Sequence, residues 1–361
     1  MRFVESRNVI HGFFKSCLRI FWFVLLWGCL SPIDFETENV GGKIVVSGQI
    51  STLPEQNFVQ LGRTADSERL PFPISGAYVT LYDDEGKFFS YVEDANNPGI
   101  YLLPDIAGVP GRTYHIMVVT PEGESYDSGP EKMAATPGDF TSSYEIVREE
   151  RIDNEGIAST QPFMKIYVNS TLPAAPDYFV RWSSMEAFLL SPTDFPDPFG
   201  NVPPPCYIEQ NADPQRIVLL NAEDLKTSTV ENLMVTSRIV DWSFYEKHYF
   251  TVFQSAMTSD AIEYWRKVDI LANQVGSIFD TPPAEIDGNI KNLNNQNEKV
   301  FGYFQAVNET YRRFVFYKED LPFPLLLPSC TFDNRDYQSY PPRCLDCTSV
   351  RNSSYRRPPY F

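Results

Sequence analysis

The stretch PISGAYVTLYDDEGKFFSYVEDANNPGIYLL, residues 73–103, decides the fold, because apolar and polar residues alternate in it between turn residues. Ala77, Val79 and Leu81 lie on one face of an extended chain, and the residues between them lie on the other. The segment DEGK at 84–87 predicts a turn, since its glycine adopts a positive φ at little cost. The pattern predicts neighbouring β-strands with one buried face.

Similar short runs extend outward from this stretch, separated by turn residues at the spacing of a β-sandwich. Seven strands are predicted near 43–50, 57–63, 77–83, 87–93, 99–103, 113–120 and 124–128. We therefore predict a mainly β protein whose residues 43–130 form an Ig-like or transthyretin-like sandwich. Residues 131–142 are predicted to link it to a second β-rich domain, 143–361, which ends in a cysteine-containing tail.

One segment of the second domain, residues 259–279, has helical rather than strand periodicity. Its apolar positions are Ile262, Trp265, Val268, Leu271, Ala272, Val275 and Phe279. Ser259 or Asp260 can cap the first amide groups. The sequence predicts one amphipathic helix packed on the second sheet.

The N-terminus reads as an export signal. Its apolar string, residues 20–27, is too short to span a bilayer, which takes about 18 apolar residues. Four basic residues and one acidic residue accompany it, so residues 1–28 are predicted to be a signal peptide. The end of the string, LLWGC, resembles a bacterial lipobox, which implies lipidation of Cys29; the alternative is an ordinary signal peptide with an incidental cysteine. Residues 29–42 then form an acidic tether, either a surface-export signal or a plain soluble linker.

The charge of the chain limits the classes of partner. The net charge is −17, and the first 28 residues carry +3, which leaves −20 for the mature chain. Nucleic acid and anionic lipid heads repel such a chain, so neither is an expected partner. The hydrophobic content of 43% is high enough for a packed core and excludes a disordered protein.

Four cysteines remain after maturation and lipidation: Cys206, Cys330, Cys344 and Cys347. An even number outside the reducing cytosol predicts disulfides, with three possible connectivities. Zinc ligation and redox chemistry at the Cys344–Cys347 pair are alternatives. A bridge to Cys206 would hold the tail on the second domain.

No motif in the sequence predicts a catalytic, metal or cofactor site. His115 and His248 each lie in a predicted strand without a partner at metal-ligand spacing, so both are expected to be structural. The acids at 83–85 lack the alternating oxygen ligands of a calcium loop and predict a plain turn. We therefore expect no metal, no cofactor and no enzymatic activity.

A stiff loop offers the clearest candidate contact surface. Residues 191–207 contain six prolines together with Phe195, Phe199 and Tyr207. Rigid aromatic side chains on such a loop can anchor a partner or ligand at low entropic cost. The alternative is a loop that packs on its own domain and is pinned by Cys206.

Two resemblances extend these predictions. Residues 73–103 with GRTYHIMVVTPEGESY (111–126) resemble carboxypeptidase-regulatory-like sandwiches, which implies architecture only. The order of helix, SIFDTPPAEIDGNI (277–290), VFGYFQA (300–306) and RCLDC (343–347) resembles the domain of unknown function 4249 family, exported lipoproteins of Bacteroidota. Members often end in Lys, Pro and an aromatic pair, whereas this chain ends SSYRRPPYF, which leaves the docking of the tail open.

The family resemblance implies an outer-membrane lipoprotein encoded beside TonB-dependent transporters. We therefore expect a lipid-anchored protein that faces the cell surface and serves such a β-barrel transporter as a substrate-capturing or lid-like accessory. The alternatives are a surface hydrolase with carboxylates in an interdomain cleft and an adhesin or structural surface protein.

Overall fold

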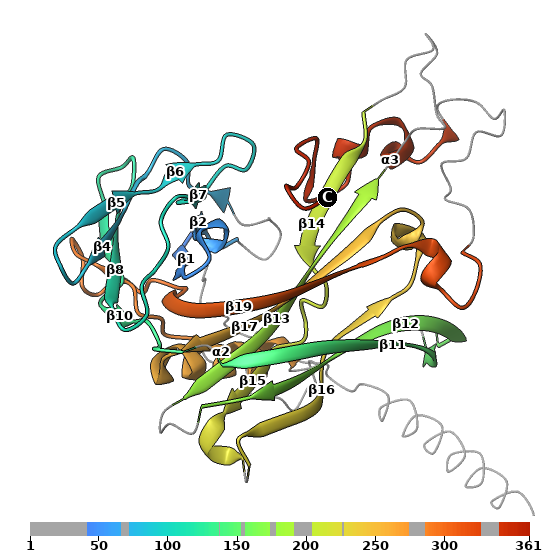
Figure 1. The fold of residues 1–361 in the computed structure, drawn as a ribbon. Helices are drawn as coiled ribbons and strands as arrows, with labels where there is room; N and C mark the ends of the chain where they lie inside the picture. The colour runs from blue at the N-terminus through green and yellow to red at the C-terminus, as the bar shows by residue number, and fades with distance from the viewer. Residues whose placement is uncertain are drawn as a thin grey trace, which may run out of the picture. The chain divides into compact units, whose positions relative to one another are not determined.

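The computed structural model describes residues 42–65, 72–136, 138–152, 156–173, 178–190, 204–225, 227–273, 286–325 and 339–361. Within these residues the chain is mainly β, which confirms the predicted fold class (Figure 1). The predicted signal peptide, Cys29 and tether residues 29–41 lie outside them, as do Phe195, Phe199 and Cys330.

The first strands form two sheets that share one core. One contains β1 (Ile44–Ser51), β2 (Phe58–Arg63), β3 (Phe72–Pro73), β6 (Val92–Glu93) and β7 (Ile100–Leu102). The other contains β4 (Tyr78–Asp83), β5 (Phe88–Ser90), β8 (Thr113–Val119), β9 (Ser125–Asp127), β10 (Glu131–Lys132) and β18 (Lys291–Asn292). Val46 and Leu61 of the first sheet and Leu81 and Ile116 of the second are at most 1% exposed and belong to one apolar cluster. The apolar residues that alternate in residues 77–82 therefore lie on the face of β4 that packs in this core.

The first sheet continues into the later part of the chain. β1 pairs in parallel with β19 (Phe304–Phe316), from Gly48 opposite Phe304 to Ser51 opposite Val307. The resulting sheet has 11 strands and runs on through β17 (His248–Met257), β13 (Phe179–Leu190), β14 (Cys206–Asn211) and β20 (Ser353–Ser354), with β15 (Val218–Asn221) also paired to β13. The regions predicted as two domains thus share one sheet.

A three-stranded sheet covers the later part of this large sheet. It consists of β11 (Asp139–Ile152), β12 (Ala158–Thr171) and β16 (Thr229–Ile239). Met164 and Ile166 of β12 pack in one buried cluster with Trp182 of β13 and with Phe250 and Val252 of β17. The second region is therefore also built from two packed sheets.

Two long strands have polar sequences that hide their strand character. β11 begins within residues 131–142, which were predicted to be a linker, and most of its side chains are polar and exposed or half-exposed. β19 is continuous through Asn308 and Glu309. These two polar side chains are buried because each has hydrogen-bond partners: Asn308 Nδ2 donates to the carbonyls of Ala134 and Ala135, and Glu309 accepts from two serines.

The predicted helix is present as α2 (Ser259–Asn273), and residues 274–279 of the prediction lie outside the described chain. Its cap is Thr258 rather than Ser259 or Asp260, because Thr258 Oγ1 accepts a hydrogen bond from the amide of Ala261 at 3.2 Å. The other helices within the described residues are short: η1 (Pro54–Gln56), η2 (Ala222–Asp224), η3 (Trp242–Phe244), η4 (Lys318–Asp320), α3 (Pro342–Leu345) and η6 (Cys347–Ser349). No helix in the described ranges is long and apolar enough to cross a membrane.

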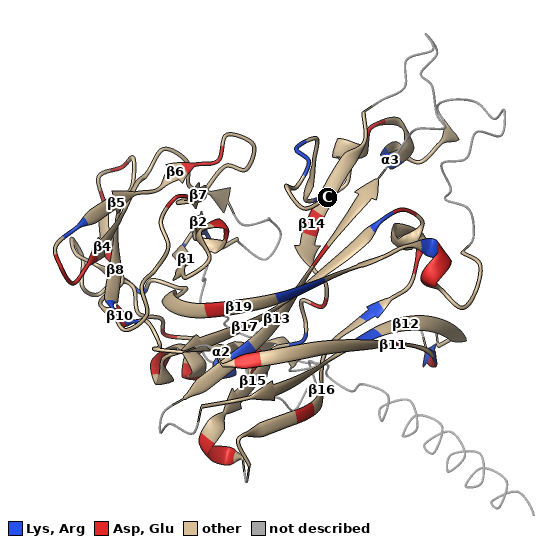
Figure 2. Ribbon diagram, in the orientation of Figure 1, with Lys and Arg blue, Asp and Glu red and all other residues tan. Residues whose placement is uncertain are grey.

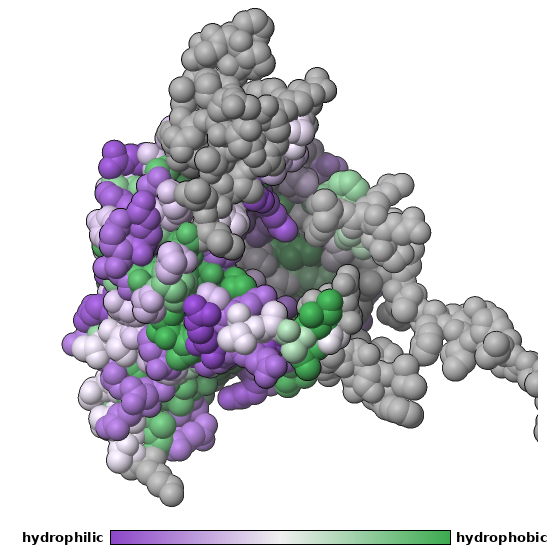
Figure 3. Space-filling view, turned by 90° about the vertical axis from the view of Figure 1, so that its right-hand side faces the viewer, coloured by the Kyte–Doolittle hydropathy of each residue, from purple (hydrophilic) through white to green (hydrophobic). Residues whose placement is uncertain are grey.

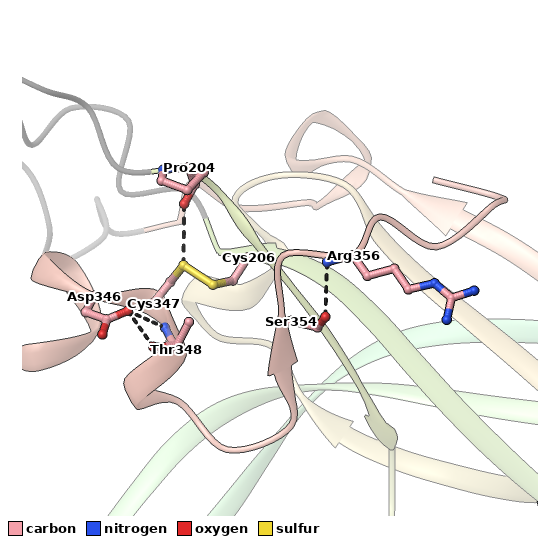
Figure 4. The surroundings of a disulfide bond; sticks show 7 residues. All are labelled: Pro204, Cys206, Asp346, Cys347, Thr348, Ser354 and Arg356. Atoms are coloured by element: carbon pink, nitrogen blue, oxygen red, sulfur yellow. Dashed lines mark hydrogen bonds between the residues drawn. A yellow bond between two sulfur atoms is a disulfide. The ribbon is translucent and has the colours of Figure 1, made fainter. Parts of the chain in front are cut away.

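A disulfide joins the C-terminal tail to the large sheet. Cys206 of β14 pairs with Cys347 of η6, and the bridge lies 3.5 Å from the carbonyl oxygen of Pro204 (Figure 4). The Asp346 carboxylate accepts hydrogen bonds from the amide and hydroxyl groups of Thr348 and so holds the turn that presents Cys347. Cys344 is also disulfide-bonded, with a partner outside the described residues. The predicted use of cysteines in disulfides is confirmed.

Removal of the Cys206–Cys347 bridge is expected to destabilise the protein strongly. The bridge closes a loop with a sequence separation of 141 residues, for which chain entropy predicts a loss of about 4–5 kcal/mol. Urea unfolding of the double variant Cys206→Ala/Cys347→Ala should show this loss, whereas Ser349→Ala, an exposed tail substitution, should unfold like the parent protein. Equal midpoints for all three proteins would contradict the role assigned to the bridge.

Candidate functional site

A cleft of about 530 Å³ lies where three segments of the chain meet. The segment from Asp127 to Glu131 supplies one wall, the first turns of α2 supply a second, and residues 287–293 with Tyr303 supply a third. Cavities of roughly 300–1,000 Å³ are the size that encloses small organic ligands. The cleft is therefore the candidate binding site.

The buried carboxylate of the cleft is Glu131 of β10, which is 5% exposed. Its Oε2 accepts a hydrogen bond from Thr258 Oγ1 at 3.0 Å, and its Oε1 accepts one from Asn289 Nδ2 at 3.3 Å and another from the hydroxyl of Tyr303. Burial raises the pKa of Glu131, the negative charge of Asp260 adds to this effect, and the three hydrogen bonds only partly oppose it. Glu131 thus forms a buried acidic floor for the cleft, whose charged form is only partly stabilised by its neutral donors.

Two tyrosine rings line the same space. The centroids of Tyr264, on α2, and Tyr303, just before β19, are 4.9 Å apart, with 31° between their planes. Burial raises the pKa of both hydroxyl groups, so both stay protonated at neutral pH. The hydroxyl of Tyr303 is committed to Glu131, which leaves ring surface as the main contribution of this pair to a ligand.

The third wall depends on a close contact between two glycines. A Cβ atom at Gly288 would lie 1.6 Å from the carbonyl oxygen of Gly302, and Gly302 itself has a φ of +97°. The neighbouring Asn289 fixes the same contact, because its side chain both accepts from the amide and donates to the carbonyl of Phe304, at 2.9 and 2.8 Å. Only a chain without side chains at these two positions can bring residues 287–293 against the start of β19.

The wall made by α2 is positioned by Trp265. Its Nε1 donates to Gln305 Oε1 at 2.8 Å, and Gln305 Nε2 donates in turn to Gln49 Oε1 at 2.9 Å. The guanidinium of Arg181 also stacks on the ring of Trp265, 3.9 Å from the ring centroid. The helix is therefore fixed to the junction of β1 and β19, and the cleft residues on α2 are fixed with it.

Charged side chains surround the opening. Exposed lining residues include Asp260, Glu263, Lys267, Asp287 and Lys291, and acidic positions gather where α2 begins (Figure 2). Glu263 is paired with Arg266 at 2.8 Å, whereas no ion pair to another described residue involves the other four. The rim thus holds charged groups that the described part of the fold leaves unused.

The arrangement is suited to binding more than to covalent chemistry. Ser128, the serine of the lining, donates its hydroxyl proton to the carbonyl of Gly129 and accepts from the amide of Ile116. No group of three or more histidine, cysteine, aspartate or glutamate side chains in the described residues could hold a metal ion. The cleft therefore offers carboxylates, an amide and aromatic rings to a ligand.

Tyr207, the described member of the predicted contact loop, packs within its own chain. Its ring centroid lies 5.0 Å from that of Phe361, which also packs on Tyr249 at 4.8 Å. The adjacent Tyr360 lies under the guanidinium of Arg313 at 3.6 Å. The chain's terminal aromatic pair thus docks on the large sheet, and Tyr207 is part of that dock.

The two histidines within the described residues occupy structural positions in strands. His115 Nδ1 lies 2.9 Å from Asp127 Oδ2 on a partly exposed sheet face. His248 is fully buried, and its Nε2 lies 3.0 Å from Glu186 Oε2, which also accepts from Arg238 Nε at 2.9 Å. Neither ring lines the cleft.

The acids at 83–85 form a turn that clasps one arginine. Arg112 lies 3.3 Å from Asp83 and 2.5 Å from Glu85, and it also bonds to Asp84. The hydrogen bond from Arg112 lowers the pKa of Asp84. These carboxylates are used within the fold.

Exposed apolar side chains also occur away from the cleft. Ile152 and Ile157, at the end of the β11–β12 hairpin, are 73% and 57% exposed. On the side of the molecule drawn in Figure 3, apolar residues are interspersed with polar ones. Dispersed apolar surface of this kind is normal for soluble proteins, so it does not compete with the cleft as a candidate site.

Sequence reasoning did not identify the cleft. Asp260 was considered only as a helix cap, and Asp287 and Asn289 were noted only as parts of a turn-rich motif. Glu131 and Tyr303 bond to each other across 172 residues of sequence, and no local pattern reports such a contact. The clustering of Gly288, Asn289 and Gly302 around apolar runs was the one available signal.

Comparison with known proteins relates the chain to one family of proteins by a sequence model. The family model described as "Domain of unknown function (DUF4249)" matches residues 31–313. No curated protein matches the chain. The matched range contains every lining residue of the cleft and ends before the tail that carries Cys347.

The glycine contact gives a direct test of the cleft's construction. Gly288→Ala is expected to lower the free energy of unfolding by about 3 kcal/mol, because the new methyl group meets backbone that cannot yield. The control Gly86→Ala, in an open turn with a φ of +79°, should lose only about 1 kcal/mol from backbone strain. Chemical denaturation measures both values, and a loss at Gly288 no larger than that at Gly86 would show that the contact is not tight.

Proposed function

The chain belongs to the DUF4249 family, and on that premise we propose that it is an outward-facing outer-membrane lipoprotein that captures a ligand for a TonB-dependent transporter. The observation that carries the proposal is the cleft, in which a buried carboxylate and two tyrosine rings lie below a rim where four charged groups have no ion pair to a described residue. A site of this volume and composition is suited to a small polar ligand.

Support for membrane attachment comes from the sequence around residue 29. The segment LLWGC ends two residues before the start of the family match at residue 31. Lipidation of Cys29 would therefore anchor the whole matched region through the acidic segment that follows. A single acyl chain holds a protein only marginally, whereas several chains hold it stably.

Support for a transporter partner comes from the family resemblance and from the physics of tethering. An anchor with a short flexible linker keeps a binding module at a high effective concentration beside a neighbouring membrane protein. Weak contacts are then sufficient for transfer of a ligand. Transfer also requires that the ligand leave easily, which an open, solvent-facing rim favours over a closed cavity.

The anchor is tested by substitution of its sulfur. We expect Cys29→Ser to move the protein from the salt-washed envelope fraction to the aqueous fraction, because the thioether can no longer form. Cys17→Ser, a change within the predicted signal peptide, is the control and should leave the protein in the envelope. Fractionation and immunoblotting report the outcome, and continued sedimentation of Cys29→Ser would overturn the anchor.

The transporter partnership is tested by purification from native membranes. A mild detergent extract of the lipidated protein should contain a β-barrel transporter at a constant ratio, and mass spectrometry identifies it. The ratio should persist on mixing with an excess of the Cys29→Ser protein, because the unanchored protein lacks the effective concentration that the anchor supplies. If no β-barrel accompanies the protein, the partnership fails.

One observation favours a second candidate, a surface hydrolase. Burial raises the pKa of Glu131, and Asp260 lies close enough to add to that effect, as expected of an acid and a carboxylate that divide catalytic work. Both oxygens of Glu131 are, however, engaged by Thr258, Asn289 and Tyr303. This engagement favours a binding floor over a proton donor.

The hydrolase candidate makes a distinct prediction. Loss of a general acid lowers turnover by about 10²–10⁴-fold, so Glu131→Gln would abolish hydrolysis of a glycoside or peptide panel. Under the binding proposal no member of the panel is hydrolysed by either protein. Hydrolysis by the parent protein that disappears in Glu131→Gln would decide for the enzyme.

A further inference from the structure

The charged side chains of the cleft differ in how deeply they are buried, and this difference favours one sign of charge on a ligand. The buried lining residues are Ser128, Glu131 and Tyr303, at 1%, 5% and 7% exposure, so they form the floor. The lysines of the lining, Lys267 and Lys291, are exposed and belong to the rim. The deepest charge is therefore a carboxylate, and an anion that entered the cleft would meet it.

The rim strengthens this preference. Five lining residues are acidic and two are basic. Asp127 is occupied by His115 and by the amide of Gly129, and Glu263 is occupied by Arg266. Asp260 and Asp287 remain without an ion pair to any described residue, and both line the cleft with Glu131. The negative charge of Asp260 repels that of Glu131 and raises its pKa. A positive group placed there would relieve that repulsion.

The aromatic wall selects an organic cation over a metal ion. Tyr264 and Tyr303 present ring surface beside the carboxylates, and the faces of aromatic rings attract ammonium and guanidinium groups. The described residues contain no cluster able to ligate a metal ion, and a volume of about 530 Å³ is far larger than an ion requires. An alkyl ammonium has a charged end that a carboxylate can bind and an apolar end that can pack against an aromatic ring.

We propose that the cleft binds a small organic cation, with a primary ammonium or guanidinium group directed to Glu131 and Asp260 and its apolar part against Tyr264 and Tyr303. Asp287 supplies a second anionic contact at the rim. The inference rests on the proposed capture function, because it names the class of ligand that this same site takes.

The test uses three probes of equal length and different charge. Isothermal titration of the mature protein in mild detergent is carried out with cadaverine, with 1,5-pentanediol and with glutarate. We expect cadaverine to bind and the neutral and anionic probes to bind at least about tenfold more weakly, because a single desolvated charge contact distinguishes them. Absence of cadaverine binding, or equal binding of pentanediol, overturns the inference.

Variants then locate the site. Asp260→Asn and Asp287→Asn are each expected to weaken cadaverine binding about fivefold, and Lys267→Met is expected to strengthen it. Asp269→Asn removes the same charge from α2 at a position outside the lining and is the matched control. Thermal unfolding should be unchanged in all four, since these side chains are not buried. If Asp260→Asn and Asp269→Asn bind cadaverine equally, the inference is wrong.

The outcome is separable from that of the proposed function. Cadaverine binding without a co-purifying transporter would contradict the proposed partnership and support the proposed ligand class. A co-purifying transporter without cadaverine binding would support the proposed partnership and contradict the proposed ligand class.

Discussion

The parallel pairing of β1 with β19 is the constraint on which the rest of the structure depends. It joins residues near the start of the described chain to residues more than 250 positions later, with Gln49 and Gln305 hydrogen-bonded across a separation of 256. The same junction receives Trp265 from α2 and therefore fixes the helix. Without this pairing, β10, α2 and residues 287–293 would have no common frame, and the cleft between them would not exist. A contact at such separation forms only after a large loss of chain entropy, so the cleft is expected to be completed late in folding.

Among the described residues three glutamates are buried, and the fold stabilises them in two different ways. For Glu186, burial acts to raise the pKa, but the hydrogen bond with His248 and the charge of Arg238 outweigh it, so the pKa is lowered and the group stays ionised. Glu309 and Glu131 receive hydrogen bonds from neutral donors, and burial raises the pKa of both.

These shifts make the stability of the fold depend on pH. For Glu186 the associated stability is present at neutral pH and is lost as the pH falls through its lowered pKa. For the other two, the folded state binds the proton more tightly, so stability declines as pH rises above the ordinary value of the group. A carboxylate held in this second way is poorly neutralised by its own fold, which is the condition that makes Glu131 receptive to an external cation.

The sequence allowed prediction of the elements that have a regular pattern. Val79 and Leu81 alternate with exposed neighbours and are buried in β4, and Ile262 and Trp265 recur at helical spacing and face the sheet. β11 was predicted to begin as a linker because its pattern is dominated by exposed polar residues. Asn308 and Glu309 interrupt the apolar pattern of β19, because long-range donors and acceptors satisfy these polar residues inside the fold. The pairing of Cys206 with Cys347 and the meeting of Glu131 with Tyr303 depend on tertiary contacts alone. Local sequence patterns predict only the elements that local sequence determines, and the cleft is formed by contacts between residues far apart in the sequence.

The C-terminal tail shows how the same aromatic residue can suggest one role in sequence and serve another in the fold. Tyr207 ends a proline-rich segment of the sequence that was predicted to be a contact loop, but in the fold it lies in β14. Phe361 packs on its ring, Arg313 stacks on Tyr360, and the Cys347 bridge holds the tail. Burial of these rings against each other removes apolar surface that would otherwise be exposed on β14 and β17. Tyr207 is thus used for the stability of the large sheet, whereas Tyr264 and Tyr303 line the cleft beside charged groups that have no ion pair to a described residue. Aromatic rings next to unneutralised carboxylates, rather than aromatic rings alone, mark the place where this protein can recognise a ligand.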